Sequence, residues 1–462
     1  MEYIDFLKQK EITAVSCGFE PTRTNERLFD WQSDIVRWAL KKGKSCIFAD
    51  CGLGKTAMQL QWAAQVAEHT NKPVLILAPL AVSTQTQREG AKFGVDVTIC
   101  RKQSDVKRGV NISNYEMLEH FDASRFGGIV LDESSILKHH ESKTRQRITE
   151  AFRNTPYKLC CTATPAPNDL VELGTHAEFM GVMTQSEMLS TFFVHDGGDT
   201  SKWRLKGHAE NKFFEWISSW ACFITSPADL GYDCQGYDLP ELNINEVVVK
   251  SNKLENADGQ QMLFCETSQT LNDRRNARRG SMADRVQAAA DIANATEEQV
   301  LIWCDLNAES EALASAINGA VEVSGSMPND IKERNMAAFT TGDARCLVSK
   351  PSIAGWGMNW QQCHKMIFVG LSDSFEAYYQ AVRRCWRFGQ ANPVDVYIVI
   401  SDAEGAVRQN IEYKQANAQR MTMELVKYTK EILQADIKQT TRISETYITT
   451  ERMETPTWLK LA

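Results

Sequence analysis

The sequence predicts an α/β protein made of two lobes, each built on a parallel sheet. Short apolar runs, as at residues 74–78 and 127–131, are typical of strands buried on both faces of such a sheet. These runs alternate with segments of helical pattern. The alternation resumes at residue 300, after a region rich in aromatic side chains. A glycine turn between a strand and a helix occurs in the first unit, and the second unit has no counterpart of it.

Composition limits the classes of function. The 462 residues suffice for about three domains of ordinary size. The net charge of −8 argues against a basic surface overall, so any contact with nucleic acid must come from a local groove. The thirteen cysteines are scattered without zinc spacing, which indicates reduced thiols in the core. No apolar run approaches the ~18 residues of a membrane span, and we expect a cytoplasmic protein.

The turn at residues 49–56 has the composition of a phosphate-binding loop. Its glycines let successive backbone N–H groups converge on a polyphosphate at a helix N-terminus. Lys55 would reach the β- and γ-phosphates, and Thr56 would ligate Mg²⁺. Ala49 stands where the strict pattern has glycine, so a plain glycine turn is the alternative. The predicted nucleotide-binding residues of the loop are Gly52, Leu53, Gly54, Lys55 and Thr56.

Two carboxylates follow the apolar run at residues 127–131. Parallel sheets bind ligands at the carboxyl ends of their strands. There Asp132 would hold Mg²⁺, directly or through water, and Glu133 would orient and deprotonate the attacking water. A helix N-cap is the alternative, but the position after a phosphate loop favours catalysis. Thr162 and Thr164 end the next strand, where hydroxyls can bond the acidic site and a mobile neighbour.

Three other features leave alternatives open. Gln32 offers a donor and an acceptor that match adenine, or it is a solvated glutamine. The aromatic side chains at residues 181–240 are typical of the core of a small helical insert, more than of a base-stacking surface. Four arginines at residues 274–279 bind phosphates or lie on a solvated helix face.

The second unit supplies the remaining candidate residues. A helix predicted over residues 378–390 carries Arg384 and Arg387, whose spacing of three places them on one face. Guanidinium groups from a separate lobe would neutralise the charge that develops at the γ-phosphate. A basic surface helix is the alternative.

Five segments occur in an order that resembles superfamily 2 helicases and translocases: CGLGKT, LDESS, TATP, SIAGWGMNW and QAVRRCWRFGQ. The arginine pair followed by Phe388-Gly389-Gln390 resembles the Swi/Snf-related branch most closely, over residues 26–400, and small phage or prophage members have a similar layout. The branch usually has aspartate at Arg383 and histidine at Trp386. The resemblance assigns residues to the site as follows: Gln32 to adenine, Arg384 and Arg387 to the finger arginines, Gly355 to the nucleotide, and Thr162, Thr164, Asn359 and Gln380 to coupling with nucleic acid.

The resemblance implies two RecA-like lobes that hold ATP and Mg²⁺ between them. We expect an N-terminal extension at 1–25, lobe 1 at 26–180, a helical insert at 181–240, lobe 2 at 241–405 and a helical tail at 406–462. The expected function is a DNA-stimulated ATPase that moves along duplex DNA by binding its phosphates. An RNA helicase and a nucleotide-gated clamp that does not travel are the alternatives.

Overall fold

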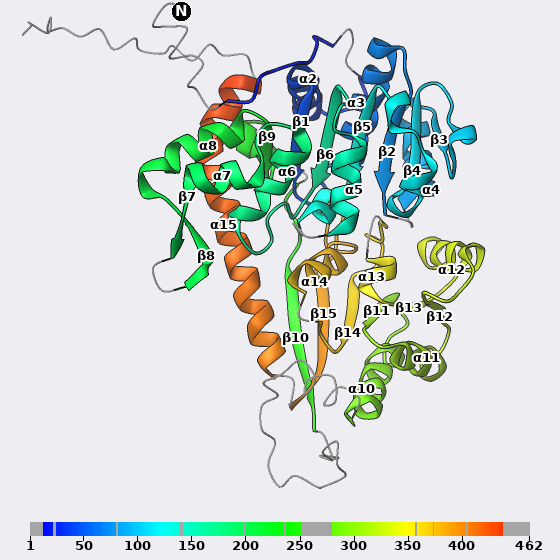
Figure 1. Ribbon diagram of the computed structural model, residues 1–462. Helices are drawn as coiled ribbons and strands as arrows, with labels where there is room; N and C mark the ends of the chain where they lie inside the picture. Colours follow the sequence, from blue (N-terminus) through cyan, green and yellow to red (C-terminus); the bar gives the residue numbers. More distant parts are fainter. Residues whose placement is uncertain are drawn as a thin grey trace, which may run out of the picture.

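The computed structural model describes residues 13–21, 25–79, 82–138, 142–196, 199–234, 237–250, 280–355, 358–372, 374–402 and 405–437. These residues form two α/β lobes, one above the other in Figure 1, each with a parallel sheet flanked by helices. This arrangement confirms the predicted fold class. The arginines at 274–279 lie outside the described residues.

Lobe 1 is organised around a seven-stranded sheet in the order β3-β4-β2-β5-β6-β1-β9, in which all pairings are parallel. The strands are β1 (Lys44–Ala49), β2 (Val74–Ala78), β3 (Val97–Ile99), β4 (Val110–Asn114), β5 (Gly128–Asp132), β6 (Tyr157–Thr162) and β9 (Ala221–Ile224). The helices are α2 (Asp30–Lys42), α3 (Lys55–Thr70), α4 (Ser83–Phe93), α5 (Lys143–Ala151), α6 (Leu173–Met180), α7 (Gln185–Phe192) and α8 (Glu210–Ser218).

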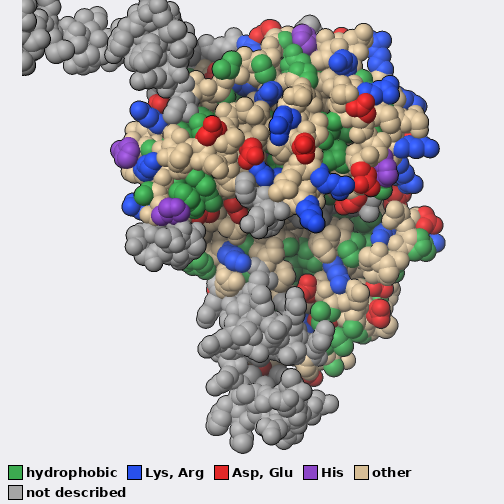
Figure 2. Space-filling model, in the orientation of Figure 1, with side chains coloured by type: hydrophobic (Ala, Val, Ile, Leu, Met, Phe, Trp, Pro, Cys, Tyr) green, Lys and Arg blue, Asp and Glu red, His purple; other side chains and the backbone are tan. Residues whose placement is uncertain are grey.

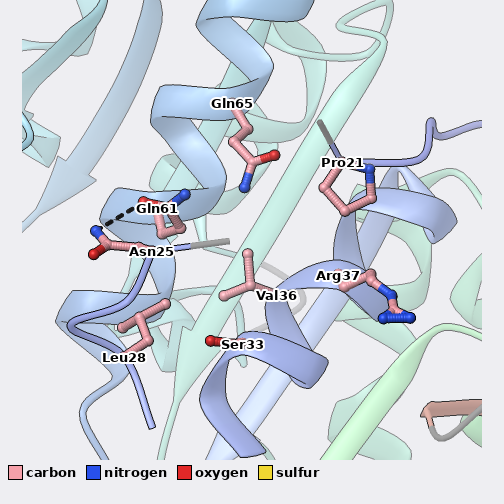
Figure 3. A pocket seen from close by; sticks show the side chains of 8 residues that line it. All are labelled: Pro21, Asn25, Leu28, Ser33, Val36, Arg37, Gln61 and Gln65. Carbon is pink, nitrogen blue, oxygen red and sulfur yellow. Dashed lines mark hydrogen bonds between the residues drawn. The ribbon is translucent and has the colours of Figure 1, made fainter. Parts of the chain in front are cut away.

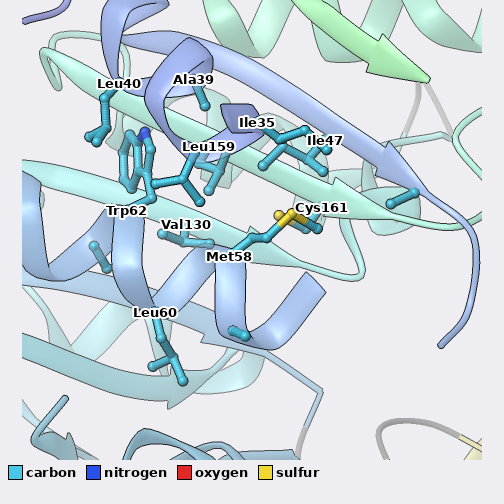
Figure 4. Close-up of a cluster of buried hydrophobic side chains, with 14 of the residues drawn as sticks. Ile35, Ala39, Leu40, Ile47, Met58, Leu60, Trp62, Val130, Leu159 and Cys161 are labelled. Carbon is cyan, nitrogen blue, oxygen red and sulfur yellow. The ribbon is translucent and has the colours of Figure 1, made fainter. Parts of the chain in front are cut away.

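Alternate residues of these strands build a separate core on each face of the sheet. Ile47 and Ala49 of β1 pack with α2 and α3, whereas Cys46 and Phe48 pack with the layer that contains α5, α6 and α8. Figure 4 shows the first core, where Trp62 of α3 lies among side chains from α2, β5 and β6. Strands buried on both faces explain the continuous apolar runs of the sequence.

Lobe 2 repeats the architecture with a six-stranded parallel sheet in the order β10-β15-β14-β11-β13-β12. The strands are β10 (Leu242–Val249), β11 (Val300–Cys304), β12 (Ala320–Val323), β13 (Cys346–Ser349), β14 (Lys365–Val369) and β15 (Val394–Ser401). The helices are α10 (Met282–Asn294), α11 (Asn307–Ala316), α12 (Asn329–Thr341), α13 (Pro351–Ala354) and α14 (Phe375–Val382).

The order of strands in lobe 1 brings distant motifs together. β6 lies between β1 and β5, and the registers pair Phe48 with Thr162 and Asp132 with Cys161. The phosphate loop after β1, the hydroxyls after β6 and the carboxylates after β5 therefore meet at one edge of the sheet, although about a hundred residues separate the first from the last of them in the sequence.

The region between the lobes differs from the helical insert expected at residues 181–240. It contains α7 and α8, but also an antiparallel hairpin of β7 (Phe193–Asp196) and β8 (Asp199–Leu205), and the strand β9. β9 pairs with β1 as the last strand of the lobe 1 sheet. The aromatic side chains of α8 are buried in the lobe 1 core, because they cover the sheet face beside β9.

A 33-residue helix, α15 (Gly405–Ile437), follows the last strand of lobe 2 and runs back to lobe 1 (Figure 1). Ile411 packs in the lobe 2 core, whereas Leu433 is buried in lobe 1. Near the helix end, Trp38 Nε1 donates to Asp436 Oδ2 at 2.9 Å. Within the described ranges, neither α15 nor any other helix is long and apolar enough to cross a membrane.

Candidate active site between the two lobes

The phosphate loop connects β1 to α3, which begins at Lys55. Gly52 and Gly54 have φ angles of 89° and 73°, in the left-handed region that disfavours other residues. A Cβ on Gly54 would lie 2.4 Å from Gln32 Nε2, so a side chain there would displace the amide that bonds Leu53 O of the loop. Lys55 Nζ donates to the carbonyls of Ala49 at 2.9 Å and Asp50 at 3.2 Å, and it thereby lies over the loop.

Gln32 connects α2 to this loop. Its Nε2 donates to Leu53 O at 3.1 Å, and its Oε1 accepts from Phe29 N at 3.2 Å. The side chain is buried. Both amide groups are therefore bonded to backbone, and binding to a base would require one of these bonds to be exchanged.

The carboxylates lie where β5 ends. Asp132 is 7% exposed, and burial next to the charge of Glu133 raises the pKa of Asp132 to about 7. Glu133 has a φ of 55°, which is unusual for a residue with a side chain and is typical of functional sites. Glu133 Oε2 accepts from Thr162 Oγ1 at 3.3 Å, and Thr162 Oγ1 accepts from Thr164 N at 3.2 Å. The motifs of β5 and β6 thus form one hydrogen-bonded group.

Lobe 2 contributes two guanidinium groups, that of Arg384, which is buried, and that of Arg387, which is half-buried. Arg384 donates to Gln380 Oε1 and to Met358 O, each at 3.0 Å. Arg387 donates to Met358 O at 3.4 Å, and its buried Nε has no hydrogen-bond partner among the residues that the structure describes. Burial and the nearby charge of Arg384 lower the pKa of Arg387 to about 10. Two crowded cations with an unpaired N–H form a binding place for an anion.

The predicted helix over residues 378–390 is wrong in its extent. The helix α14 ends at Val382, and Arg384 and Arg387 lie in the turns that follow. Gln390 explains the break in part, because its Nε2 donates to the carbonyls of Gln361 and Cys363 at 2.9 and 3.0 Å. Gly389, with a φ of 87°, also departs from helix. The two arginines reach the same cleft from a turn and not from one helix face.

One cleft, of about 390 Å³, contains most of the predicted site residues. Asn359 also lines it, with a buried Oδ1 that no described residue bonds. Gly355 does not line it and caps α13, where a Cβ would collide with Pro351 O. The predicted residues that line the cleft are Gln32, Gly52, Gly54, Lys55, Thr56, Asp132, Glu133, Asn359, Arg384 and Arg387.

Three other predicted residues do not line the cleft. Thr162, Thr164 and Gln380 are buried, so they reach other groups only through contacts within the protein. Thr164 Oγ1 donates to Glu376 Oε1 at 3.2 Å, and Glu376 also pairs with Lys138. This contact joins the end of β6 to α14 of lobe 2. Leu53 is buried in the lobe 1 core.

Other contacts in and beside the cleft were not predicted from the sequence. Tyr237, from the segment between the lobes, and Phe388, from lobe 2, line the cleft with ring centroids 4.6 Å apart. Asp50 and Arg383 form an ion pair across the lobes. Their partners come from the other lobe, so only the folded structure identifies them.

A second hollow lies beside α2 and α3, between Asn25, Val36 and Gln65 (Figure 3). Its volume is about 10 Å³, which accommodates no more than one water molecule. Asn25 Nδ2 donates to Gln61 Oε1 at 3.2 Å across it. This hollow is therefore a packing defect between the N-terminal segment and α3. The cleft between the lobes is the candidate active site because most of the predicted site residues line it.

The surface shown in Figure 2 carries Lys and Arg side chains spread over lobe 1 and interspersed with Asp and Glu. This pattern agrees with the net charge of −8. Contact with a polyanion on this face would therefore depend on local groups of cations and not on a uniformly basic face.

A buried histidine, His176, contacts the turn that follows the carboxylates of β5. His176 Nε2 lies 3.1 Å from Ser134 Oγ, next to Glu133 in the sequence. Burial lowers the pKa of His176 to about 4, so between pH 4 and the unfolded value near 6.5 the unfolded chain binds more protons. Stability should fall as pH falls through that window, by up to about 3 kcal/mol from this group.

This prediction is tested by urea unfolding between pH 7 and pH 4.5. His176→Asn removes the titrating group, so the pH dependence of its unfolding free energy should be flatter than that of the wild-type chain. His120→Asn, at an exposed position, is the control and should keep the wild-type slope. Equal slopes for all three chains would show that folding does not lower the pKa of His176.

Comparison with known proteins matches each lobe to a family. Residues 31–193 match the SNF2-related domain and residues 281–389 match the helicase conserved C-terminal domain, so the two matches together cover more than half of the chain. Curated proteins give no match. The 806 matching chains of solved structures include the Sulfolobus solfataricus SWI2/SNF2 ATPase core in complex with dsDNA, 17% identical over 91% of this chain and 98% of that chain, with a TM-score of 0.42.

Proposed function

Because this chain belongs to the SNF2-related family of helicase-type ATPases, we propose that it hydrolyses ATP between its lobes and uses the cycle to move along DNA. The observation that carries the proposal is the composition of the cleft. Lobe 1 supplies Lys55 and Glu133, and lobe 2 supplies Arg387. A site that is complete only when both lobes contribute links hydrolysis to their relative movement.

In this proposal the phosphates of ATP bind at the loop, where backbone N–H groups and Lys55 Nζ receive them. Lys55 would exchange its present bonds to two loop carbonyls for bonds to the β- and γ-phosphates. Glu133, held by Thr162, would orient the attacking water and accept its proton. Arg384 and Arg387 would stabilise charge on the γ-phosphate.

Mg²⁺ fits the donors of Thr56 and Asp132, since hydroxyl and carboxylate oxygens are its preferred ligands. The raised pKa of Asp132 beside Glu133 also indicates a place where a cation would be favoured. When bound, the ion would neutralise charge on the phosphate oxygens.

The proposed coupling follows a chain of contacts from the base to lobe 2. Glu133 accepts from Thr162, Thr162 accepts from Thr164, and Thr164 donates to Glu376 of α14. A change at the γ-phosphate would alter the packing of α14 through these bonds. Alternating closure and opening would then let the lobes take turns in holding the phosphates of DNA.

We expect the ATPase rate of the purified chain to rise with duplex DNA, with little dependence on base sequence, because phosphate contacts carry no sequence information. Affinity for DNA should fall linearly on a log–log plot against salt concentration. ATPase assays with duplex DNA, single-stranded DNA and RNA test the preference, and triplex displacement tests movement.

Two results would favour the alternatives. Stimulation by RNA but not by DNA would indicate an RNA helicase. Binding that depends on ATP, with negligible turnover on every nucleic acid, would indicate a nucleotide-gated clamp. Stimulation by duplex DNA without displacement of a triplex strand would support the ATPase and contradict processive movement.

A further inference from the structure

Arg383 binds the phosphate loop from the other lobe. Its Nη2 lies 2.7 Å from Asp50 Oδ2 and 2.7 Å from Cys51 O, and the residue is 4% exposed. Tyr379, one turn earlier on α14, donates its hydroxyl to Asp50 Oδ1. Asp50 is therefore held by two side chains of lobe 2, both from the same end of α14.

Asp50 is in turn bonded to the parts of lobe 1 that shape the nucleotide site. Its backbone N donates to Ile224 O of β9 at 3.0 Å, and its Oδ1 accepts from Cys51 N at 2.6 Å. Its carbonyl accepts from Lys55 Nζ at 3.2 Å. If lobe 2 moves the Asp50 carboxylate, the phosphate loop moves with it. The Asp50 carbonyl, which accepts from Lys55 Nζ, moves as well.

Arg383 is poorly placed to bind phosphate itself. Asp50 and Cys51 O occupy its Nη2, Tyr379 and Trp386 lie with their rings 5.8 and 5.0 Å from its guanidinium carbon, and it does not line the cleft. The neighbouring Arg384 and Arg387 do line the cleft. Arg384 and Arg387 therefore line the proposed nucleotide site, whereas Arg383 binds the phosphate loop.

We propose that the ion pair of Asp50 and Arg383, here called the interlobe latch, positions the phosphate loop and Lys55 when the two lobes are in contact. Both are positioning residues: they act on the reaction through Lys55 and through closure, without touching ATP. The inference rests on the proposed function for its effect on turnover. The contact itself can be tested in the chain without nucleotide.

A double-mutant cycle of Asp50→Asn and Arg383→Gln tests the latch, because the asparagine side chain would keep the oxygen that Cys51 N and Tyr379 use. Each single variant should lower the DNA-stimulated kcat by about 10- to 100-fold while changing the affinity for a fluorescent ATP analogue little. The double variant should lose no more than the worse single variant. Arg383→Lys should recover part of the rate, since it keeps the charge but not the planar fork.

The matched control is the ion pair of Glu298 and Lys365 within lobe 2, 2.5 Å apart and away from the cleft. Glu298→Gln and Lys365→Gln should leave kcat and nucleotide affinity unchanged. Urea unfolding of all variants without nucleotide gives the second measurement, and the Asp50 and Arg383 variants should be coupled there too.

Three results would overturn the latch: losses in kcat that multiply in the double variant, loss of nucleotide binding in Asp50→Asn alone, or coupling in unfolding with none in kcat. The last result would mean that the pair is merely structural. A wild-type chain that hydrolyses no ATP would refute the proposed function instead, and coupling in unfolding would still report the interlobe contact.

Discussion

Glu133→Gln should bind ATP with nearly wild-type affinity and lose about 10²- to 10⁴-fold in kcat. Glutamine keeps the size of the side chain and can still accept from Thr162 Oγ1. It has no basic oxygen to take the proton of the attacking water. Single-turnover hydrolysis and equilibrium binding of a fluorescent ATP analogue measure the two effects separately.

The strained backbone of Glu133 requires a control, because any substitution at a φ of 55° could disturb the turn. Glu133→Asp keeps a carboxylate but withdraws it by one methylene, so it should also hydrolyse slowly if the position of the oxygen matters. Lys55→Ala should instead weaken binding, since a phosphate partner is lost in the ground state. If Glu133→Gln hydrolysed ATP at the wild-type rate, a residue other than Glu133 would be the general base.

The parts of the site that the sequence predicted follow from local rules. Buried parallel strands give continuous apolar runs, and their carboxyl ends share one edge of a sheet, so the loop after β1 and the carboxylates after β5 could be placed near each other. The glycines of the loop are required by their own φ angles. None of these features depends on how the two lobes are packed.

The features that the sequence did not predict depend on contacts between distant segments. Arg383 finds its partner at Asp50, 333 residues away in the sequence, and no periodicity records that distance. β9 was not predicted, because it has only four residues and lies in a stretch rich in aromatic side chains. It belongs to the sheet through its pairing with β1, a distant segment of the sequence. Helix α14 is shorter than its pattern predicted in part because Gln390 bonds carbonyls of the segment before β14.

Arg387→Ala should give the largest loss, about 10³- to 10⁵-fold in kcat, and should abolish stimulation by DNA. Arg387 enters the cleft from lobe 2, with a buried Nε that has no partner within the described part of the chain. Its pKa is lowered by burial and by Arg384, so an anion in the cleft would relieve an unfavourable pair of cations. The Arg387→Ala substitution would leave the phosphate loop and the carboxylates of lobe 1 in place.

The distinguishing measurement compares binding, chemistry and stimulation in Arg387→Ala, Arg387→Lys and the control Lys365→Gln. Nucleotide affinity should change little, because the contacts of lobe 1 persist. Lysine should restore little of the rate, since a point charge does not reproduce the planar fork of a guanidinium. If Arg387→Ala still hydrolysed ATP at an undiminished, DNA-stimulated rate, closure of lobe 2 would not complete the site. The buried Nε of Arg387 would then belong to a basic turn with no part in the reaction.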